Sequence, residues 1–420
     1  MKYNRTEIGD KIGFSAIIDE KFKSSYISIR FITKLDKKTA AENVLAISGL
    51  TDTNEKYNTI AEMSEILTEL YGASLSSSAR KRGDLQILTV SSSWLSSKYA
   101  LYGEDIEKDM LDIVSDCVFR PNIVNGEFES ESFAINRMEL LDRIDAEFNN
   151  KRGYVITKAC ETAFKGEPAQ LSCYGDRETA ENVTAAQTYD AYKNLLETAQ
   201  IEIFFVSSAE NPYAEKVLRD GFAEIKRSPV AVQFKSISPV KAEPVELSEQ
   251  FDVNQCKMVM AFKTVSDDEY ALHLLSVILG ESPVSKLFTN VREKLSLCYY
   301  CASHMALTKG TLLIDSGVER VNIEKAKTEI VKQIDEIRNG NVSDEEIESA
   351  VLAAQNSLEQ VGDTMYSYAS WFFDRYCDDD FITPSEMLEI YRGITKERIV
   401  NAACSLVHDC TYIMLDREEA

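Results

Sequence analysis

The chain repeats itself, and this repeat limits what its 420 residues can fold into. The pattern I-E-K-x-x-x-x-I-V at residues 106–114 returns at residues 323–331, an offset of 217. The sequence E-F-E-S at 127–130 returns as E-I-E-S at 346–349, an offset of 219. One short match carries little weight, but matches in the same order at similar offsets indicate two copies of one domain.

A third match lies near the end of each copy. The pattern T-x6-A-x3-L at 184–195 precedes an apolar strand at 201–206, and it returns at 395–406, an offset of 211, ahead of a strand at 412–415. Looser correspondences join the apolar segments 26–35 with 257–265 and 85–90 with 311–314. The order of these segments is the same in both halves of the chain.

The segment between the two copies is rich in proline. Residues 228–248 hold Pro229, Pro239 and Pro244, three of the eight prolines in the chain. Proline fixes the backbone φ angle, so this segment is predicted to be an extended, stiffened linker. We therefore expect an N-terminal domain at 1–227, a linker at 228–248 and a C-terminal domain at 249–420.

Each copy reads as strands first, then long helices, then a final helix that leads into a strand. In the first strand Ile27, Ile29 and Phe31 alternate with Ser28 and Arg30, which is the period of a strand with two different faces. The predicted fold class is α+β, with two tandem homologous domains that each contain an antiparallel-rich sheet covered by helices. The aromatic run at 371–373 is predicted to face a core.

Charge and composition exclude several classes of function. The net charge of −23 argues against nucleic-acid binding and favours attraction to basic partners. No segment approaches twenty apolar residues and the first residues are polar, so we expect a cytoplasmic protein without a membrane segment. The nine cysteines are an odd, scattered set, which favours reduced and mostly buried thiols over disulfides.

One segment of the second copy is similar to a known family. Leu287-Phe288, Arg292-Glu293-Lys294 and Leu297-Cys298-Tyr299 resemble the L-F-x-x-x-R-E-K-x-G-L-A-Y segment of pitrilysin/insulinase-type zinc metallopeptidases. Those proteins are tandem α+β halves of about this length. The resemblance implies the same two-domain fold, as one half of a hinged clamshell.

The family's catalytic motif is missing from this chain. An H-x-x-E-H helix holds zinc between two histidines and activates water with the glutamate. The three histidines here, His273, His304 and His408, are too far apart in sequence to form it. Zinc is therefore not expected in this chain.

The motif is expected near residues 39–53. There our alignment places Asn43, Ala46 and Ile47 at the positions of histidine, glutamate and histidine. Further along it places Arg143 at the third zinc ligand, a position where a cation would repel the metal. The aligned positions therefore form a degenerate zinc motif.

The chain resembles the noncatalytic members of the bacterial branch, which pair with an active chain bearing the zinc motif. Residues 69–73 and 174–175 are similar to segments of such partners, some of which occur in loci linked to modification of elongation factor P. In these pairs the inactive subunit supplies an arginine and a tyrosine that hold peptide at the partner's zinc. The resemblance gives those roles to Arg292 and Tyr299.

Spacing permits this pair but does not prove a function. Seven residues span about two helical turns, so both side chains could share one face if the helix continues that far. The alternative is that Arg292 forms a local salt bridge and Tyr299 packs in the core. Ser296 replaces the family's usual glycine, so the turn before Tyr299 is open to change.

A second candidate site is Cys298-x-x-Cys301-x-x-His304, a spacing found in metal and redox sites. Because a strand is expected here, residues three apart should point to opposite faces, which favours buried thiols.

The sequence thus predicts a noncatalytic subunit that pairs with an H-x-x-E-H-bearing chain, or with itself, and helps to hold peptide. Zinc would be supplied by the partner subunit. The alternative is a stand-alone structural or peptide-binding scaffold, either as a monomer or as a homodimer.

Overall fold

The computed structural model describes residues 1–417 and divides into two units. Unit 1 comprises Met1–Asp145, Leu171–Phe234 and Gly362–Asp380. Unit 2 comprises Ala146–Gln170, Lys235–Val361 and the residues from Phe381 onwards. The chain therefore passes between the units several times rather than once.

Unit 1 is built on a six-stranded sheet with the strand order β1-β2-β8-β3-β5-β4. Its strands are β1 (Lys2–Gly9), β2 (Ile12–Ile18), β3 (Ser24–Lys34), β4 (Ser74–Arg82), β5 (Leu85–Leu95) and β8 (Gln200–Ser207); β6 (Ile123–Val124) and β7 (Glu127–Phe128) form a separate hairpin. Neighbouring strands are antiparallel except for β2 and β8. The predicted antiparallel-rich sheet is confirmed, and β4 lies at one edge of it.

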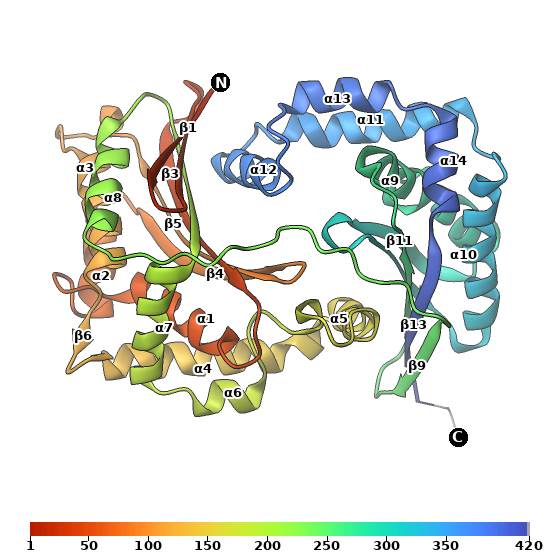
Figure 1. The fold of residues 1–420 in the computed structure, drawn as a ribbon, viewed down its shortest axis with the longest axis horizontal. Coiled ribbons are helices and arrows are strands. Elements are labelled where there is room, and N and C mark those ends of the chain that lie inside the picture. The colour runs from red at the N-terminus through yellow and green to blue at the C-terminus, as the bar shows by residue number, and fades with distance from the viewer. Residues whose placement is uncertain (418–420) are drawn as a thin grey trace. The chain divides into compact units, whose positions relative to one another are not determined.

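Helices cover both faces of this sheet (Figure 1). The helices of unit 1 are α1 (Ala40–Asp52), α2 (Ile60–Glu69), α3 (Ile106–Phe119), α4 (Ser130–Ala146), α6 (Arg177–Asn182), α7 (Ala185–Thr198), α8 (Pro212–Ala223) and α12 (Met365–Cys377), with a 3-10 turn η1 (Ser97–Tyr99). Ile27, Ile29 and Phe31 of β3 point into the main core with α1, α3, α7 and α8. Ser28 and Arg30 lie on the opposite face, where α12 packs on β3 and β8.

Unit 2 contains a five-stranded sheet with the order β11-β12-β10-β13-β9. Its strands are β9 (Val245–Gln250), β10 (Cys256–Lys263), β11 (Cys298–Ala306), β12 (Thr311–Val318) and β13 (Val407–Leu415). Its helices are α5 (Lys151–Ala163), α9 (Glu269–Ser276), α10 (Ile323–Arg338), α11 (Asp344–Gln360), α13 (Pro384–Arg392) and α14 (Lys396–Cys404), with π-helical η4 (Val277–Glu281) and η5 (Leu287–Lys294) and 3-10 turns η2 (Glu147–Asn149), η3 (Pro168–Gln170), η6 (Leu307–Lys309) and η7 (Arg320–Asn322). Only β9 and β13 pair in parallel.

The two sheets have the same topology, which confirms the predicted repeat. The order β2-β8-β3-β5-β4 of unit 1 matches β9-β13-β10-β12-β11 of unit 2, including the one parallel pair. Thr184 and Thr395 are the N-caps of α7 and α14, and each hydroxyl accepts a backbone N–H of its helix. One sequence match was wrong in register, because 127–130 spans β7 and the start of α4, whereas 346–349 lies inside α11.

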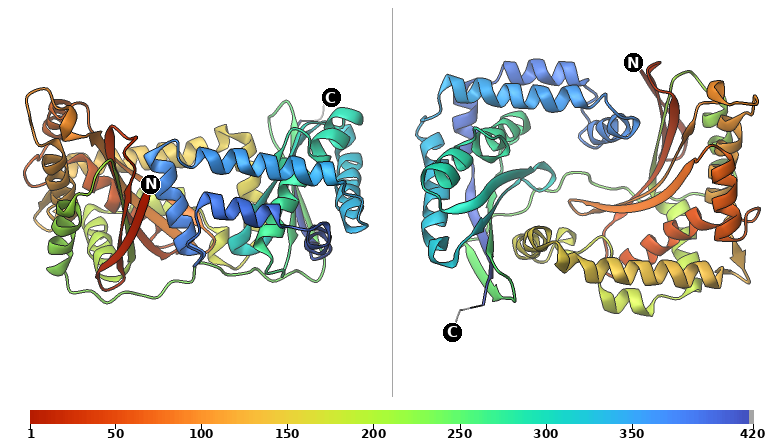
Figure 2. Two further views of the ribbon diagram at one scale, coloured as in Figure 1. Left: turned by 90° about the horizontal axis from the view of Figure 1, so that it is seen from above. Right: turned by 180° about the vertical axis from the view of Figure 1, so that it is seen from behind.

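Two helices pack on a sheet that is not formed by their own half of the sequence. The helix α5 follows α4 of the first repeat but packs on the sheet of unit 2, and α12 follows α11 of the second repeat but packs on the sheet of unit 1. Figure 2 shows α5 in yellow beside the green and blue strands of unit 2, and α12 in blue beside the red strands of unit 1. Val155 and Ala159 of α5 share a core with Val259 and Tyr412 of unit 2. In α12, Phe373 lies against Phe204 of β8, so the aromatic run does face a core. Since α5 follows α4 as α12 follows α11, the exchanged helices are equivalent elements.

The predicted linker is largely without regular structure, but its last residues, 245–248, belong to β9. Its first residues, up to Phe234, belong to unit 1, and the part from Lys235 onwards is held on unit 2 by polar contacts. The Ser238 hydroxyl donates to Glu167, and the buried Lys263 ammonium donates to the Pro239 carbonyl at 2.8 Å. Among the described helices, none is long and apolar enough to cross a membrane.

Candidate functional site

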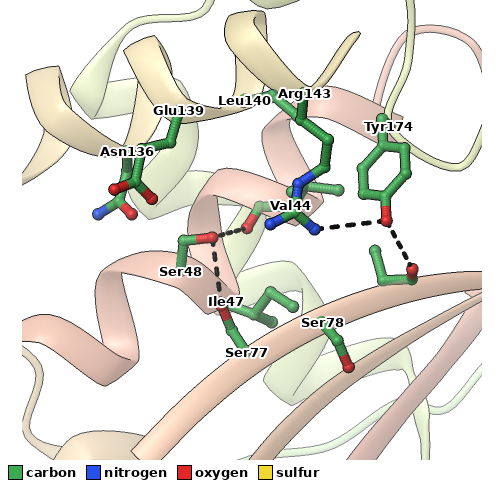
Figure 3. Close-up of a pocket in the computed structure, with 11 residues that line it drawn as sticks. Val44, Ile47, Ser48, Ser77, Ser78, Asn136, Glu139, Leu140, Arg143 and Tyr174 are labelled. Carbon is green, nitrogen blue, oxygen red and sulfur yellow. Dashed lines mark hydrogen bonds between the residues drawn. The ribbon is translucent and has the colours of Figure 1, made fainter. Parts of the chain in front are cut away.

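A small pocket in unit 1 lies where α1, α4 and the edge strand β4 meet (Figure 3). Its cavity volume is about 30 Å³, roughly the share of liquid volume taken by one water molecule. It is lined by Val44, Ile47, Ser48, Ser77, Ser78, Ala79, Asn136, Glu139, Leu140, Arg143 and Tyr174. Only Ile47 and Arg143 among the predicted residues line it.

The pocket-facing side of α1 carries the spacing of the zinc motif, displaced by one residue from our alignment. Val44, Ile47 and Ser48 stand at i, i+3 and i+4, which places them on one helical face. Asn43 instead points inward, where its amide donates to Gln86 Oε1 at 3.0 Å. Ala46 is completely buried. The helix α1 therefore presents two apolar side chains and one hydroxyl to the pocket.

Helix α4 brings Arg143 to the opposite wall of the pocket. Its Nη1 donates to the Tyr174 hydroxyl at 3.4 Å, and its guanidinium carbon lies 5.3 Å from the centre of the Tyr174 ring. The Tyr174 hydroxyl in turn donates to the Ala79 carbonyl of β4 at 3.3 Å. Figure 3 shows this chain of contacts running from α4 to the strand. A guanidinium therefore stands in the pocket, hydrogen bonded only to a neutral phenol in the part of the chain described.

This pocket does not fit zinc. The metal takes thiolate, imidazole or carboxylate ligands, usually four including water. Glu139 is the one side chain of that kind among the lining residues, and Arg143 lies one helical turn beyond it. Within residues 1–417 there is no cluster of three His, Cys, Asp or Glu side chains suited to a metal. The arrangement offers hydrogen-bond donors, not a hydrolytic centre.

Arg292 and Tyr299 lie in unit 2 but not on one helix. The helix η5 ends at Lys294, and Tyr299 is the second residue of β11, so the condition for a shared helical face, a helix that continues to Tyr299, is not met. Ser296 takes a left-handed conformation with φ of 50°, so the turn keeps the backbone that glycine would favour. The pairing of β11 with β12 shifts by one residue between Cys298 and Tyr300. Tyr299 is thus the extra residue of a β-bulge, a device that re-aims a side chain.

Both side chains are accessible. Tyr299 is 59% exposed and does not pack in the core, and its hydroxyl donates to Glu319 at 3.2 Å. This hydrogen bond to a carboxylate raises the pKa of Tyr299. Arg292 lies 3.6 Å from Glu293 and 4.7 Å from the centre of the Phe288 ring. The local salt bridge expected for Arg292 is therefore present at a long distance, at the surface.

The bulge also changes the cysteine pair. Cys298 lies opposite Val318 and Cys301 opposite Ser316, two residues apart on β12, so both thiols are on one face. The prediction that they point apart was wrong for this pair, because the bulge inserts a residue between them. The contact with Cys298, together with burial, raises the pKa of Cys301. His304 turns to Asp315, 3.2 Å from its Oδ1, so the three residues do not form one site.

Comparison with known proteins finds relatives among metallopeptidases described as inactive. The family description "Peptidase M16 inactive domain" matches residues 182–353. The "Probable inactive metalloprotease YmfF" of Bacillus subtilis (strain 168) is 26% identical over 405 residues, covering 96% of this chain and 95% of that protein. These comparisons confirm the family resemblance: residues 182–353 match the inactive-domain description of the M16 peptidases, and nearly the whole chain is similar to a relative named as a probable inactive metalloprotease.

Other relatives extend this result. An "Uncharacterized zinc protease" of Rickettsia bellii (strain RML369-C) is 25% identical and covers 67% of this chain and 69% of its own length. A solved structure of a conserved protein from Enterococcus faecalis V583 has a TM-score of 0.91 at 22% identity, covering 100% and 99% of the two chains. The peptidase M16 inactive domain from Pseudomonas fluorescens has a TM-score of 0.77 at 15% identity, covering 99% and 98%.

These findings bear on activity and on fold. The description as inactive agrees with the prediction that this chain is not itself a peptidase. The two solved structures support the fold.

Proposed function

We propose that this chain is the noncatalytic, peptide-holding subunit of a split zinc metallopeptidase. The observation that carries the proposal is the pocket, in which Val44, Ile47 and Ser48 keep the spacing of H-x-x-E-H but not its chemistry. A fold that keeps the helix, the edge strand and the pocket while losing the metal ligands is suited to binding peptide without hydrolysing it.

The edge strand gives the pocket a way to hold an extended chain. Residues 77–79 of β4 line the pocket, and β4 is the last strand of its sheet. A terminal strand can take an extended peptide as one further strand, with affinity from main-chain hydrogen bonds. Arg143 lies beside this edge and can donate to a peptide carbonyl or carboxylate. It cannot activate water as a zinc ion does.

In this proposal the partner is a paralogue with an intact zinc motif, which supplies the metal and the general base. Arg292 and Tyr299 would reach its substrate, and both are exposed on unit 2. An arginine can hold a peptide carbonyl, and a phenol can donate to a developing oxyanion. We place the pair in the cytoplasm, because the nine cysteines of the sequence are an odd, scattered set that favours reduced thiols. The link to elongation factor P modification stays a prediction.

The decisive experiment is gentle purification of the endogenous protein, followed by mass spectrometry of chains recovered in near-equal amount. A co-purifying chain with H-x-x-E-H supports the proposal, and the mixture should then cleave peptides that neither chain cleaves alone. Recovery as a monomer or homodimer instead favours the scaffold alternative. In that case Arg292 and Tyr299 have no substrate-holding role at a partner's zinc. Peptide binding at the pocket of unit 1 can then be measured separately.

A further inference from the structure

Unit 1 contains a buried arginine whose charge is not neutralised. Arg30 lies in the middle of β3, on the sheet face under α12, and is only 3% exposed. Its guanidinium carbon lies 4.4 Å from the ring centre of Phe373 and 5.0 Å from that of Phe204. Aromatic rings attract a cation but do not replace the hydrogen bonds that a guanidinium loses on leaving water.

The nearby carboxylates are bound by other arginines. Glu202 lies opposite Arg30 on β8, but it accepts two hydrogen bonds from Arg5, at 2.8 and 3.2 Å. Asp374 of α12 lies 3.1 Å from Arg82 and 3.6 Å from Arg80. Between residues 1 and 417, Nη1 of Arg30 has no hydrogen-bond partner, and no carboxylate forms a salt bridge with this side chain.

Arg30 nevertheless carries its charge at neutral pH. Burial, and after it the neighbouring Arg80, lowers the pKa of Arg30 to about 10. A buried cation without a partner is strongly unfavourable, so proteins normally supply a carboxylate or a ligand. Ser28, two residues earlier on the same face, also has a buried hydroxyl for which the described chain provides no partner. Two orphaned polar groups thus occupy adjacent positions on one sheet face.

A row of small hydroxyl side chains connects Arg30 with the edge of the sheet. Thr89 of β5 lies directly opposite Arg30, and Ser78 of β4 lies opposite Thr89. Thr89 is half-buried and Ser78 is exposed. Both side chains are short, and we call this line from Arg30 through Thr89 to Ser78 the hydroxyl row. Arg80, at the β4 end of this row, packs over Phe373.

We propose that Arg30, approached along the hydroxyl row, binds the carboxylate of an acidic side chain in a peptide that lies along β4. A planar carboxylate matches the planar fork of a guanidinium, and Arg80 adds a second cation at the entrance. The inference rests on the proposed peptide-holding function and adds a substrate class to it. The net charge of −23 suggests basic ligands, but Arg30 forms no ion pair within residues 1–417 and therefore favours an acidic group at this point of unit 1.

The test uses the full chain alone, so it does not depend on finding a partner. Two fluorescent octapeptides with blocked ends, identical except for a central glutamate or glutamine, are titrated by anisotropy. We expect the glutamate peptide to bind about tenfold more tightly, the preference of one charge-assisted contact. Arg30→Met should abolish this preference without lowering the melting temperature, because it removes an uncompensated charge. Arg219→Met, an exposed arginine of α8, is the control and should leave the preference intact.

Each outcome decides the proposal. Equal affinity of the two peptides for the native chain, or a preference that survives Arg30→Met, overturns it. If Arg30→Met does not fold, the half-exposed Arg80 is changed to glutamine instead. Arg80→Gln should weaken the preference for the glutamate peptide severalfold, and an unchanged preference would then overturn the proposal.

Inorganic phosphate is the third probe. If phosphate stabilises the native chain but not Arg30→Met, and the glutamate peptide does not, the site binds free phosphate and the peptide assignment is wrong. The pairing with a zinc-bearing chain would survive any of these results.

Discussion

Arg152 of α5 and Asp315 of β12 form a charged pair that fixes the exchanged helix on the sheet of unit 2. Nη2 of Arg152 donates to Oδ1 of Asp315 at 3.0 Å, and Nε donates to Oδ2. Asp315 is 1% exposed, and His304 also contacts its Oδ1. Although burial alone would raise it, the bonds from His304 and Arg152 hold the pKa of Asp315 below its usual value.

Asp315→Ala should therefore destabilise the protein more than the loss of a surface ion pair. We expect the free energy of unfolding to fall by about 2 kcal/mol, because hydrogen bonds to a buried charge are lost. Asp145→Ala is the control, since its pair with Arg177 is half exposed on both sides; there we expect less than about 1 kcal/mol. Denaturant unfolding measures both, and equal effects would show that the buried pair does not anchor α5.

The position of the degenerate motif can be tested by rebuilding zinc ligands. Val44→His with Ser48→His places two imidazoles on the pocket face of α1, four residues apart, near Glu139. With Arg143→Gln to remove the cation, this variant should bind one equivalent of zinc and gain thermal stability. Asn43→His with Ile47→His, in the same Arg143→Gln background, is the control. It has the same spacing, but Asn43 points away from the pocket, so only position 47 can present an imidazole there, and the variant should lose stability without binding zinc. Zinc binding by the second variant would place the motif where the sequence alignment did.

The turn before Tyr299 carries strain that glycine would remove. Ser296 has φ of 50°, a conformation unfavourable for residues with a Cβ. Ser296→Gly should raise the free energy of unfolding by about 1 kcal/mol. Ser96→Gly is the comparison, because Ser96 has φ of −62° and gains nothing from glycine. If Ser296→Gly destabilises the chain as Ser96→Gly does, the strain argument is wrong.

His408 should make stability depend on pH in the mildly acidic range. Burial lowers the pKa of this imidazole, and Nε2 lies 2.9 Å from the Thr411 hydroxyl. The unfolded chain therefore takes up a proton near pH 6.5, while the folded chain resists it. Folding stability contributed by neutral His408 is thus present above that pH and is lost as the pH falls through the folded pKa. Relative to His408→Gln, the native chain should lose stability between pH 7 and pH 5; parallel curves would contradict this.

Arg292→Ala tests the role in trans, once a partner is found. The change should leave melting temperature and pairing unaltered, because the side chain makes only surface contacts. Peptide cleavage by the complex should fall by about tenfold or more, the loss of one charged contact to substrate. Lys294→Ala, two residues on in the same helix, is the matched control. Unchanged turnover in the Arg292 variant would remove this residue from the proposed site.

The sequence predicted the repeated α+β architecture because local signals support it. Ile27, Ile29 and Phe31 alternate as the structure requires, and Thr184 and Thr395 cap equivalent helices. These features depend on neighbours in sequence. The exchange of α5 and α12 was not predictable in the same way, because an amphipathic helix shows which side is apolar but not which sheet it covers.

The pocket was harder to place for a physical reason. Most of α1 is buried, so no polar stripe marks the side that faces the pocket, and a shift of one residue turns the helix by about 100°. The same limit applies to β11, where one extra residue at Tyr299 brings Cys298 and Cys301 to one face. The alternating pattern of β3 correctly predicted that Arg30 lies on the opposite sheet face from Ile29 and Phe31. Nothing in the sequence shows that its carboxylate neighbours are bound to other arginines.

The reciprocal exchange of α5 and α12 also constrains how such a chain can arise and be taken apart. Two free copies of a single repeat, each lending its equivalent helix to the other, would form a symmetrical domain-swapped dimer. Joining the copies through residues 228–248 turns that dimer into one chain. Neither half is then a self-sufficient folding module, since each lacks a helix that its own sheet needs. A single protease cut in the linker should leave two fragments that stay together until the protein is denatured.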